Sequence, residues 1–271
     1  MKLWISDSDI VYLKISDNAP TDYYFSKLCF SNPPLDADRN GTIININDGN
    51  DLRYNLEKDE CFFPSDISEY QRCFLLRQVI DVIQLKRGNL PLHAAAVSDG
   101  KTAFIIAAES GKGKSYISDA ICKIFPGFYL IGDDHIIISS NHIQGNVKRR
   151  IRDRYSSKVE YADNRGLDRL RDITFICFCF SEMVDRMTYL SKSDALSQYS
   201  SVSAFKYLNE VFQYNNESYG VEKISEIDVD NEYRNAFFNF VSMNKVLYVS
   251  GTPQYAIECI SDKIGKTSIR I

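Results

Sequence analysis

The pattern of hydrophobic and polar residues changes along the chain, and its first part indicates β-structure. Residues 1–65 carry short runs rich in Ile, Val, Tyr and Phe, separated by clusters of Asp, Asn, Pro and Gly. Such runs predict strands, which we place at residues 2–6, 10–15, 23–30 and 42–47. We therefore expect a small β-rich N-terminal domain over residues 1–65, acting as a binding or scaffolding appendage.

A helical period replaces this pattern after residue 65. Apolar residues then recur every three or four positions, which predicts one buried helical face. They are Phe74, Leu75, Val79, Val82, Ile83 and Leu85. We expect a connecting segment over residues 66–90, with its helix ending near Lys86 because Gly88 follows.

From residue 91 onward, strand and helix patterns alternate, which favours an α/β domain over residues 91–271. The expected strands are residues 91–98, 102–107, 128–131, 172–180 and 245–250. We expect four helices. The first begins at Gly113 or Lys114, and the others span residues 193–213, 230–243 and 253–264, the last closed by Gly265. The run at 172–180 is apolar throughout, so we place it at the centre of the sheet.

Composition and charge exclude several classes of protein. Hydrophobic residues make up 44% of the chain and charged ones 25%, as expected for a globular protein. The net charge of −4 argues against bulk affinity for nucleic acid or anionic membrane. We find neither a signal-length apolar run at the start nor 18 consecutive apolar residues, so we expect a cytoplasmic protein. The seven cysteines contain no C-x-x-C pair, which favours free thiols over zinc or disulfides.

A phosphate-binding motif follows the strand at 102–107. Residues 108–115, AESGKGKS, match the pattern G-x-x-x-x-G-K-[ST] at every position except the first. Gly111 and Gly113 allow the backbone to bend with its N–H groups pointing inward, at a helix N-terminus that already favours an anion. Lys114 supplies a charge for the β- and γ-phosphates, and Ser115 offers a hydroxyl to Mg²⁺. Residues Ser110 to Tyr116, Lys112 included, are therefore candidate nucleotide-binding residues.

Ala108 occupies the first position of the motif, where the pattern has glycine. Alanine can serve there only if its φ is negative, because a left-handed conformation costs a non-glycine residue about 1–2 kcal/mol. The alternative is a surface loop that is rich in Gly and Lys by chance. The apolar strand before the loop and the helix after it are the context that the motif requires.

Asp133 and Asp134 end the predicted strand about 20 residues after the loop. One carboxylate can hold Mg²⁺ while the other accepts a proton from a hydroxyl group. The alternative is an ordinary polar β-turn. His93 lies on a strand that a tight turn at residues 98–101 connects to the strand before the loop, which brings it near the site. A lone histidine is more often structural, but the small residues at 94–96 leave room for close approach.

Two further groups of polar residues follow the aspartates. The sequence after the aspartates predicts a β-hairpin with its turn at residues 140–142. We interpret His135, at the start of the hairpin, and His142, in its turn, as solvent or turn residues. The basic run KRRIRDR at residues 148–154 is either a solvated face or a phosphate-binding element. Guanidinium groups suit the spread charge of a transferring phosphoryl group, so Arg149, Arg150 and Arg152 are candidates for the γ-phosphate.

The motifs LHAAAV, AESGKGKS and LIGDD together resemble the HPr kinase/phosphorylase family. They also resemble its smaller relatives, including the kinases found with lasso-peptide and other modified-peptide pathways. The loop and LIGDDH are similar to the nucleotide core of phosphoenolpyruvate carboxykinases. The resemblance covers residues 67–139 well and the C-terminal KVLYVSG-TPQYAIECISDKI loosely. It implies an HPr-kinase-like P-loop core with a mixed sheet and flanking helices.

The resemblance also implies an activity and roles for single residues. In that family the loop binds ATP, one of the two aspartates acts as the base towards an acceptor serine, and the other helps to hold Mg²⁺. Carried onto this chain, Lys114 and Ser115 hold phosphate and metal, and Asp133 is the first choice for the base. Asp134 is the further metal ligand, and His93 lies beside these residues as a catalytic candidate together with Lys114. Relatives form rings or dimers, so the resemblance leaves room for a homo-oligomer.

This chain departs from the family in two respects. The glycine-rich signature that full-length family members carry after the aspartates is missing, so we expect forward kinase activity alone. The N-terminal region has no clear similarity, so HPr itself is not the expected acceptor. We therefore predict an ATP- and Mg²⁺-dependent kinase that phosphorylates a hydroxyl, typically a serine of a small protein or peptide. The alternatives are a non-catalytic nucleotide sensor that binds a partner and a small-metabolite kinase.

Overall fold

The computed structural model describes the backbone of most of the C-terminal half and of separate N-terminal strands. The described residues are 2–6, 9–15, 41–49, 53–55, 60–64, 80–139, 142–145, 148–152, 157–161, 167–169, 172–197, 212–214, 217–219 and 229–268. Side chains are described at residues 62, 80–139, 143–145, 172–197 and 231–265. No helix within these ranges is both long enough and apolar enough to cross a lipid bilayer.

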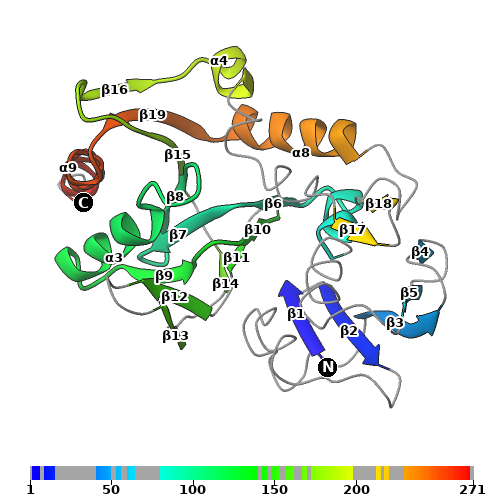
Figure 1. Cartoon of the computed structure of the whole chain (residues 1–271). Helices are drawn as coiled ribbons and strands as arrows, with labels where there is room; N and C mark the ends of the chain where they lie inside the picture. Colours follow the sequence, from blue (N-terminus) through cyan, green and yellow to red (C-terminus); the bar gives the residue numbers. More distant parts are fainter. Residues whose placement is uncertain are drawn as a thin grey trace.

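A mixed six-stranded sheet forms the centre of the described α/β structure (Figure 1). Its strands, in spatial order, are β16 (Arg186–Tyr189), β19 (Lys245–Gly251), β15 (Asp172–Phe180), β8 (Thr102–Ala107), β7 (Ala94–Ser98) and β9 (Tyr129–Gly132). β15 runs parallel to both β8 and β19, whereas β7 and β16 are antiparallel to their neighbours. The predicted α/β class and the central place of β15 are confirmed, whereas the pattern analysis did not predict β16.

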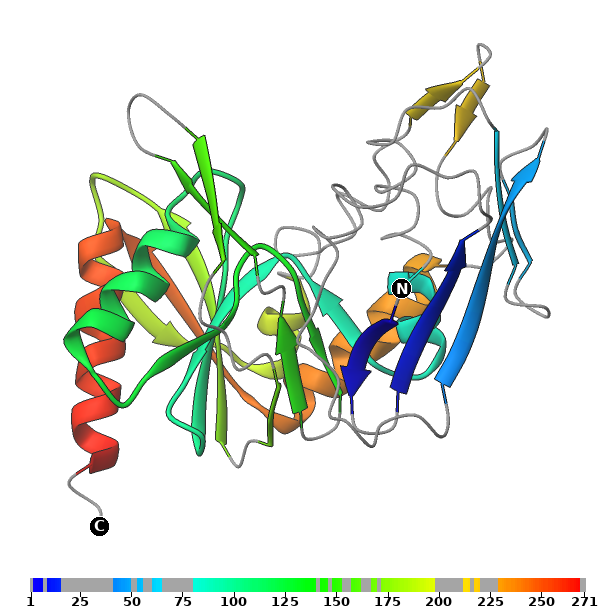
Figure 2. The ribbon, with the colours of Figure 1, turned by 90° about the horizontal axis from the view of Figure 1, so that it is seen from below.

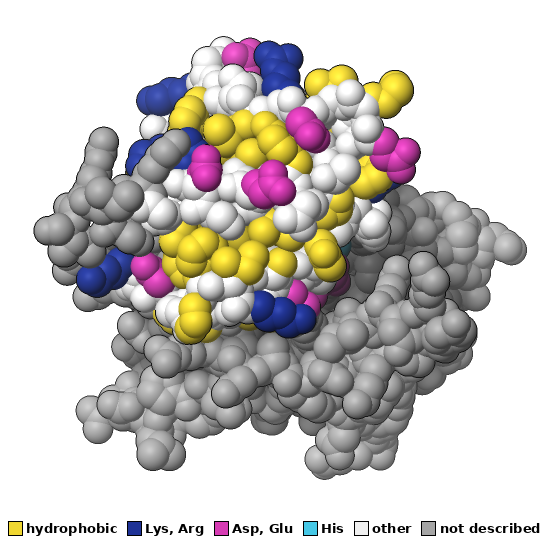
Figure 3. All heavy atoms as spheres, turned by 90° about the vertical axis from the view of Figure 1, so that its left-hand side faces the viewer, with side chains coloured by type: hydrophobic (Ala, Val, Ile, Leu, Met, Phe, Trp, Pro, Cys, Tyr) yellow, Lys and Arg dark blue, Asp and Glu magenta, His cyan; other side chains and the backbone are white. Residues whose placement is uncertain are grey.

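Helices cover both faces of this sheet (Figure 2). On one face, α3 (Lys114–Ile124) and α9 (Pro253–Ser268) pack side chains such as Ile117 and Ile260 against Phe104 and Ile106. Figure 3 looks at the outside of this helical layer and shows two bands of hydrophobic side chains with acidic side chains between and beside them.

The other face of the sheet is covered by α8 (Val229–Met243). Phe240 of α8 meets the Phe175 ring of β15 edge to face, with ring centroids 5.4 Å apart. The predicted inward residues of this helix are all buried, which confirms its apolar face; they are Tyr233, Ala236, Phe237, Phe240 and Val241.

A second sheet of four strands lies next to the first. It contains β14 (Leu167–Arg169), β11 (His142–Gly145), β10 (Ile136–Ile138) and β6 (Leu90–Leu92), in that order. Only His93 separates β6 from β7, and only residues 133–135 separate β9 from β10. Since β6 pairs with β10 and β7 pairs with β9, the chain passes between the two sheets twice at the same level. The single strand predicted at residues 91–98 is therefore wrong: it is two strands broken at His93.

A close contact between strands accompanies this change of sheet. Gly145 of β11 lies so close to β9 that an added Cβ would be 2.7 Å from the Gly132 nitrogen and the Ile131 carbonyl oxygen. No side chain fits in that space, so glycine is required at position 145. This contact fixes the second sheet against the end of β9, directly before the two aspartates.

The N-terminal strands form a five-stranded sheet of their own. Its order is β1 (Lys2–Ser6), β2 (Asp9–Ile15), β3 (Gly41–Gly49), β5 (Glu60–Pro64) and β4 (Arg53–Asn55). Three predicted strands match β1, β2 and β3 closely, and the one predicted at residues 23–30 lies outside the described residues. Separate domain status for residues 1–65 stays a prediction. Of the connecting helix, residues 80–86 are described, and the helix ends at Lys86 as predicted.

Two predicted helices have different bounds in the structure. α4 (Lys192–Ser197) is short, and residues of the predicted helix at 193–213 instead enter β17 (Phe212–Tyr214), which pairs with β18 (Glu217–Tyr219). The prediction of a helix up to residue 213 is therefore wrong, because aromatic residues at its end pair across a hairpin. α9 continues through Gly265 to Ser268, so this glycine does not end the helix.

Candidate functional site

The phosphate-loop motif occupies the turn between β8 and α3, as predicted. Gly111 and Gly113 have φ values of 77° and 102°, in the left-handed region that glycine tolerates best. Asp134 is the only non-glycine residue with positive φ in the described part of the chain, so Ala108 meets the condition stated above. Gly113 caps α3 without a side-chain hydrogen bond, which leaves the first backbone N–H groups of the helix suited to an anion.

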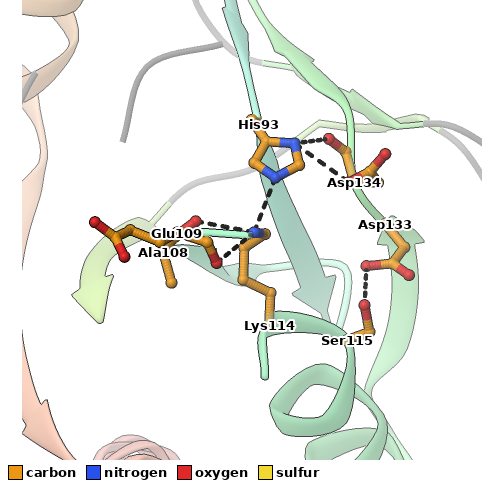
Figure 4. Close-up of polar contacts among 7 residues, drawn as sticks. All are labelled: His93, Ala108, Glu109, Lys114, Ser115, Asp133 and Asp134. Atoms are coloured by element: carbon orange, nitrogen blue, oxygen red, sulfur yellow. Dashed lines mark hydrogen bonds and ion pairs between the residues drawn. The ribbon is translucent and has the colours of Figure 1, made fainter. Parts of the chain in front are cut away.

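Lys114 points back into the loop and is 6% exposed (Figure 4). Its Nζ lies 2.9 Å from the Ala108 carbonyl oxygen, 3.2 Å from the Glu109 carbonyl oxygen and 2.9 Å from His93 Nε2. An ammonium group has three N–H donors, so these contacts use its full donor capacity. Burial lowers the pKa of Lys114, while the negative charges of Asp134 and Asp133 act in the opposite direction.

His93 links the loop to the aspartates. Its Nδ1 lies 2.8 Å from the Asp134 carbonyl oxygen and 3.2 Å from Asp134 Oδ1. A carbonyl oxygen can only accept, so we assign the ring proton to Nδ1, which leaves Nε2 to accept from Lys114. The ring thereby joins Asp134 to the lysine of the phosphate loop.

The two carboxylates lie in different environments. Asp133 is 3% exposed and accepts a hydrogen bond from Ser115 Oγ at 2.8 Å. Burial raises its pKa to about 6, against the opposing effect of that hydrogen bond. The Asp134 side chain is 62% exposed, and its φ of 71° costs a non-glycine residue about 1–2 kcal/mol. Such strain persists only where neighbouring contacts hold the backbone in place.

The structure brings five of the candidate residues together: His93, Lys114, Ser115, Asp133 and Asp134 (Figure 4). They come from the two passages between sheets and from the start of α3. Their spatial convergence is the arrangement that the motifs predicted, while their chemical roles stay predictions.

Other candidates lie further out or are not described. Ser110, Gly111 and Lys112 are exposed, and Lys112 Nζ lies 5.4 Å from the centroid of the Phe180 ring. Tyr116 is 59% exposed on α3 and makes none of the contacts within the five-residue cluster. The arginines at 149, 150 and 152 belong to β12 (Lys148–Arg152), which pairs with β13 (Ser157–Tyr161). Their side chains lie outside the described residues, so their role is untested.

Sequence reasoning missed one polar pair next to this cluster. His135, interpreted above as a solvent or turn residue, is 3% exposed, and its Nε2 lies 2.8 Å from Asp81 Oδ1. Asp81 is also 3% exposed and comes from the helix at 80–86. The interpretation of His135 is therefore wrong. Its partner Asp81 lies 54 positions earlier. The signal for this pair was a charged residue, Asp81, within an otherwise apolar helical stretch. His142 begins β11, and its side chain is not described.

Some oxygen atoms of the cluster are of the kind that Mg²⁺ binds, although the described residues contain no group of three or more His, Cys, Asp or Glu side chains placed to hold a metal ion. Ser115 Oγ and the two carboxylates are hard oxygen ligands at one end of the sheet. Mg²⁺ is usually bound through one or two carboxylates together with water and substrate phosphates, so Ser115, Asp133 and Asp134 are the residues here that could hold it. Comparison with known proteins gives no family for the chain: no protein-family model and no curated protein matches it.

Proposed function

We propose that this protein is an ATP- and Mg²⁺-dependent kinase of the HPr-kinase-like type. It transfers the γ-phosphoryl group to a hydroxyl, typically a serine of a small protein or peptide. The observation that carries the proposal is the convergence of the phosphate loop, Lys114 and the two aspartates: His93 connects Lys114 to Asp134, and Ser115 donates a hydrogen bond to Asp133. Phosphoryl transfer depends mainly on positioning and charge neutralisation, which this set of groups supplies.

Each residue has a defined task in this mechanism. The backbone N–H groups from Gly111 into α3 bind the phosphates, and Lys114 neutralises charge on the β- and γ-phosphates. Ser115 and Asp134 would hold Mg²⁺, and the ion would supply positive charge that offsets the negative charge of the phosphates. Asp133 accepts the proton of the acceptor hydroxyl as its oxygen bonds to the γ-phosphorus. The bond from that phosphorus to the β–γ bridging oxygen breaks, and ADP leaves.

The environment of Asp133 supports its assignment as the base. A pKa of about 6 keeps the carboxylate ionised at pH 7 while making it more basic than an ordinary aspartate. The hydrogen bond from Ser115 supports the opposite division, with Asp133 near the metal and Asp134 as the base. Substituting each aspartate by asparagine separates the two. Substitution of the aspartate that acts as the base removes transfer even at saturating Mg²⁺. Substitution of the aspartate that holds the metal raises the Mg²⁺ concentration needed for half-maximal rate.

The direct test is transfer of labelled γ-phosphate from ATP to small proteins and peptides encoded by neighbouring genes. Lys114→Ala serves as the blank, and Lys123→Ala is the matched control because Lys123 is exposed in the last turn of α3, at the end of the helix opposite the phosphate loop. Label in a hydroxyl acceptor with wild type and the control, but not with the blank, supports the proposal. Absence of transfer to every acceptor, despite nucleotide binding, would favour the sensor.

The alternative functions separate in the same assay. For a kinase, Asp133→Asn should keep nucleotide binding and lose transfer by about 10²-fold or more, the scale of general-base catalysis. If the protein is a sensor, wild type catalyses no phosphoryl transfer, so the substitution has no transfer rate to change. A small-metabolite kinase is recognised by label that stays with a small molecule instead of a protein.

A further inference from the structure

The segment that carries the two aspartates lies between two sheets and belongs to neither. β9 ends at Gly132 and pairs with β7, while β10 begins at Ile136 and pairs with β6 and β11. Residues 133–135 therefore lie outside both ladders, and their backbone groups need other partners. Side chains supply two points of attachment for this segment: His93 binds the Asp134 carbonyl oxygen, and Asp81 binds the His135 ring.

Asp81 comes from a rigid part of the molecule. The helix at 80–86 buries Ile80, Val82 and Leu85, each at most 2% exposed. Its end is closed by a hydrogen bond from the Gly88 nitrogen to the Leu85 carbonyl oxygen. A second bond, from Asn89 Nδ2 to Gln84 Oε1 at 2.7 Å, connects the helix to the chain that enters β6. The Asp81 carboxylate is thus held by a packed helix.

A gain in stability does not explain why Asp81 and His135 are paired inside the protein. Burying a carboxylate and an imidazole removes both from water, and hydrophobic residues of similar volume often stabilise a core equally well. Position gives a better reason. His135 follows Asp134 in the sequence, and the Asp134 backbone has a positive φ. Such a backbone would relax to negative φ if neighbouring contacts did not hold it. His93 and Asp81 thus contact the segment at two neighbouring residues, Asp134 and His135.

We propose that Asp81 is a positioning residue that acts through His135 to hold the Asp133–Asp134 turn against the phosphate loop. The proposal rests on the function proposed above, in which this turn provides the base and a ligand of Mg²⁺. Displacing such groups by about 1 Å can slow an enzyme by about 10²-fold. Asp81 itself contacts neither nucleotide nor metal in this scheme.

The test compares two substitutions of Asp81. Asp81→Asn keeps an oxygen that accepts the N–H of His135, whereas Asp81→Leu keeps the approximate volume and removes the acceptor. Val82→Ala is the matched control, because Val82 is fully buried on the same helix and its truncation destabilises the fold without removing the acceptor for His135. Should Asp81→Leu fail to fold, His135→Phe removes the same hydrogen bond from the other side.

Two measurements decide the outcome. For Asp81→Leu we expect kcat at saturating ATP and Mg²⁺ to fall by about 10²-fold. The gain in affinity for a non-hydrolysable ATP analogue on adding Mg²⁺ should also be lost, while Mg²⁺-free affinity stays. Asp81→Asn should recover both within about fivefold. The proposal is overturned if Asp81→Leu behaves like Val82→Ala in both assays, or if Asp81→Asn is as impaired as Asp81→Leu.

Backbone hydrogen exchange separates this proposal from the proposed function. In Asp81→Leu, amides of residues 133–135 should exchange at least about tenfold faster, while those of residues 108–118 in the phosphate loop and α3 should not change. Unchanged exchange at 133–135 would overturn the positioning role whatever the activity. If wild type transfers no phosphate, the kinase proposal fails, and the exchange pattern still decides whether Asp81 holds the turn.

Discussion

Replacing the buried carboxylate of Asp133 with an amide should make the protein more stable while slowing phosphoryl transfer by about 10²-fold or more. In Asp133→Asn, an uncharged amide replaces the carboxylate, and its oxygen can still accept the hydrogen bond from Ser115 Oγ. The folded protein no longer has to hold a negative charge out of water at neutral pH. We therefore expect the variant to unfold at higher temperature and higher urea concentration than wild type.

The magnitude follows from the pKa of Asp133. Burial raises it to about 6, whereas an aspartate in an unfolded chain titrates near 3.9. A difference of about two pKa units corresponds to about 3 kcal/mol of destabilisation at pH 8. The amide also loses the hydrogen bond that the carboxylate accepts from the Asp134 backbone, worth about 1 kcal/mol. The expected net gain in the free energy of unfolding is therefore about 2 kcal/mol.

The sign of the pH dependence follows from proton binding. Between about pH 4 and pH 6 the folded state binds the proton more tightly than the unfolded state, so wild type loses stability as pH rises through this window. The advantage of Asp133→Asn should therefore shrink by about 1.5 kcal/mol between pH 8 and pH 5. The lost hydrogen bond affects both pH values alike and cancels from this difference.

Urea unfolding at pH 8 and pH 5, followed by circular dichroism, measures both quantities. Asp262→Asn is the control, because Asp262 is exposed on α9 and its replacement should change stability by at most about 0.5 kcal/mol at either pH. A variant that is less stable than wild type at pH 8, or an advantage independent of pH, would refute the reasoning. Asp133 would then not be held as a strained anion.

Three further predictions concern the phosphate loop, the pH profile and α9. Lys114→Met should weaken binding of an ATP analogue about 10–100-fold in calorimetry, the worth of a charged hydrogen bond, whereas Lys123→Met, at the far end of α3, should stay within about threefold. Equal effects would contradict the loop assignment. kcat/KM should fall about tenfold per pH unit below pH 6 as Asp133 gains a proton, and a flat profile down to pH 5 would exclude it as the base. Gly265→Ala should raise stability by roughly 0.5–1 kcal/mol in thermal unfolding, because alanine has a higher helix propensity than glycine and the added methyl group has open space. A loss of stability would show that the helix is strained at this position.

Local patterns predicted the parts of this protein that depend on neighbouring residues. The phosphate loop was recognisable because its glycines, lysine and serine lie within eight positions between an apolar strand and a helix. The buried face of α8 followed from its period, since burial repeats with each turn. Both features arise from interactions within one or two elements.

Features that depend on distant pairing were not predictable in this way. The break at His93 exists because β6 and β7 pair with different strands more than 30 positions later. The burial of His135 depends on Asp81, 54 positions away. β16 has only four residues, three of them exposed, and its partner β19 lies more than 50 positions later. In each case the deciding energy comes from tertiary contacts that a short window of sequence does not contain.

The engaged ammonium of Lys114 has a consequence for how a nucleotide would enter. The side chain has already lost its hydration shell on folding, and its three N–H groups are held by two carbonyls and an imidazole. A phosphate that binds Lys114 would therefore replace one of these protein acceptors, whereas a solvated lysine would release water. His93 Nε2 is the only side-chain atom among the three acceptors, so rotation of its ring could release the cation without unfolding the loop. Nucleotide capture and the orientation of His93 would then be one coupled event.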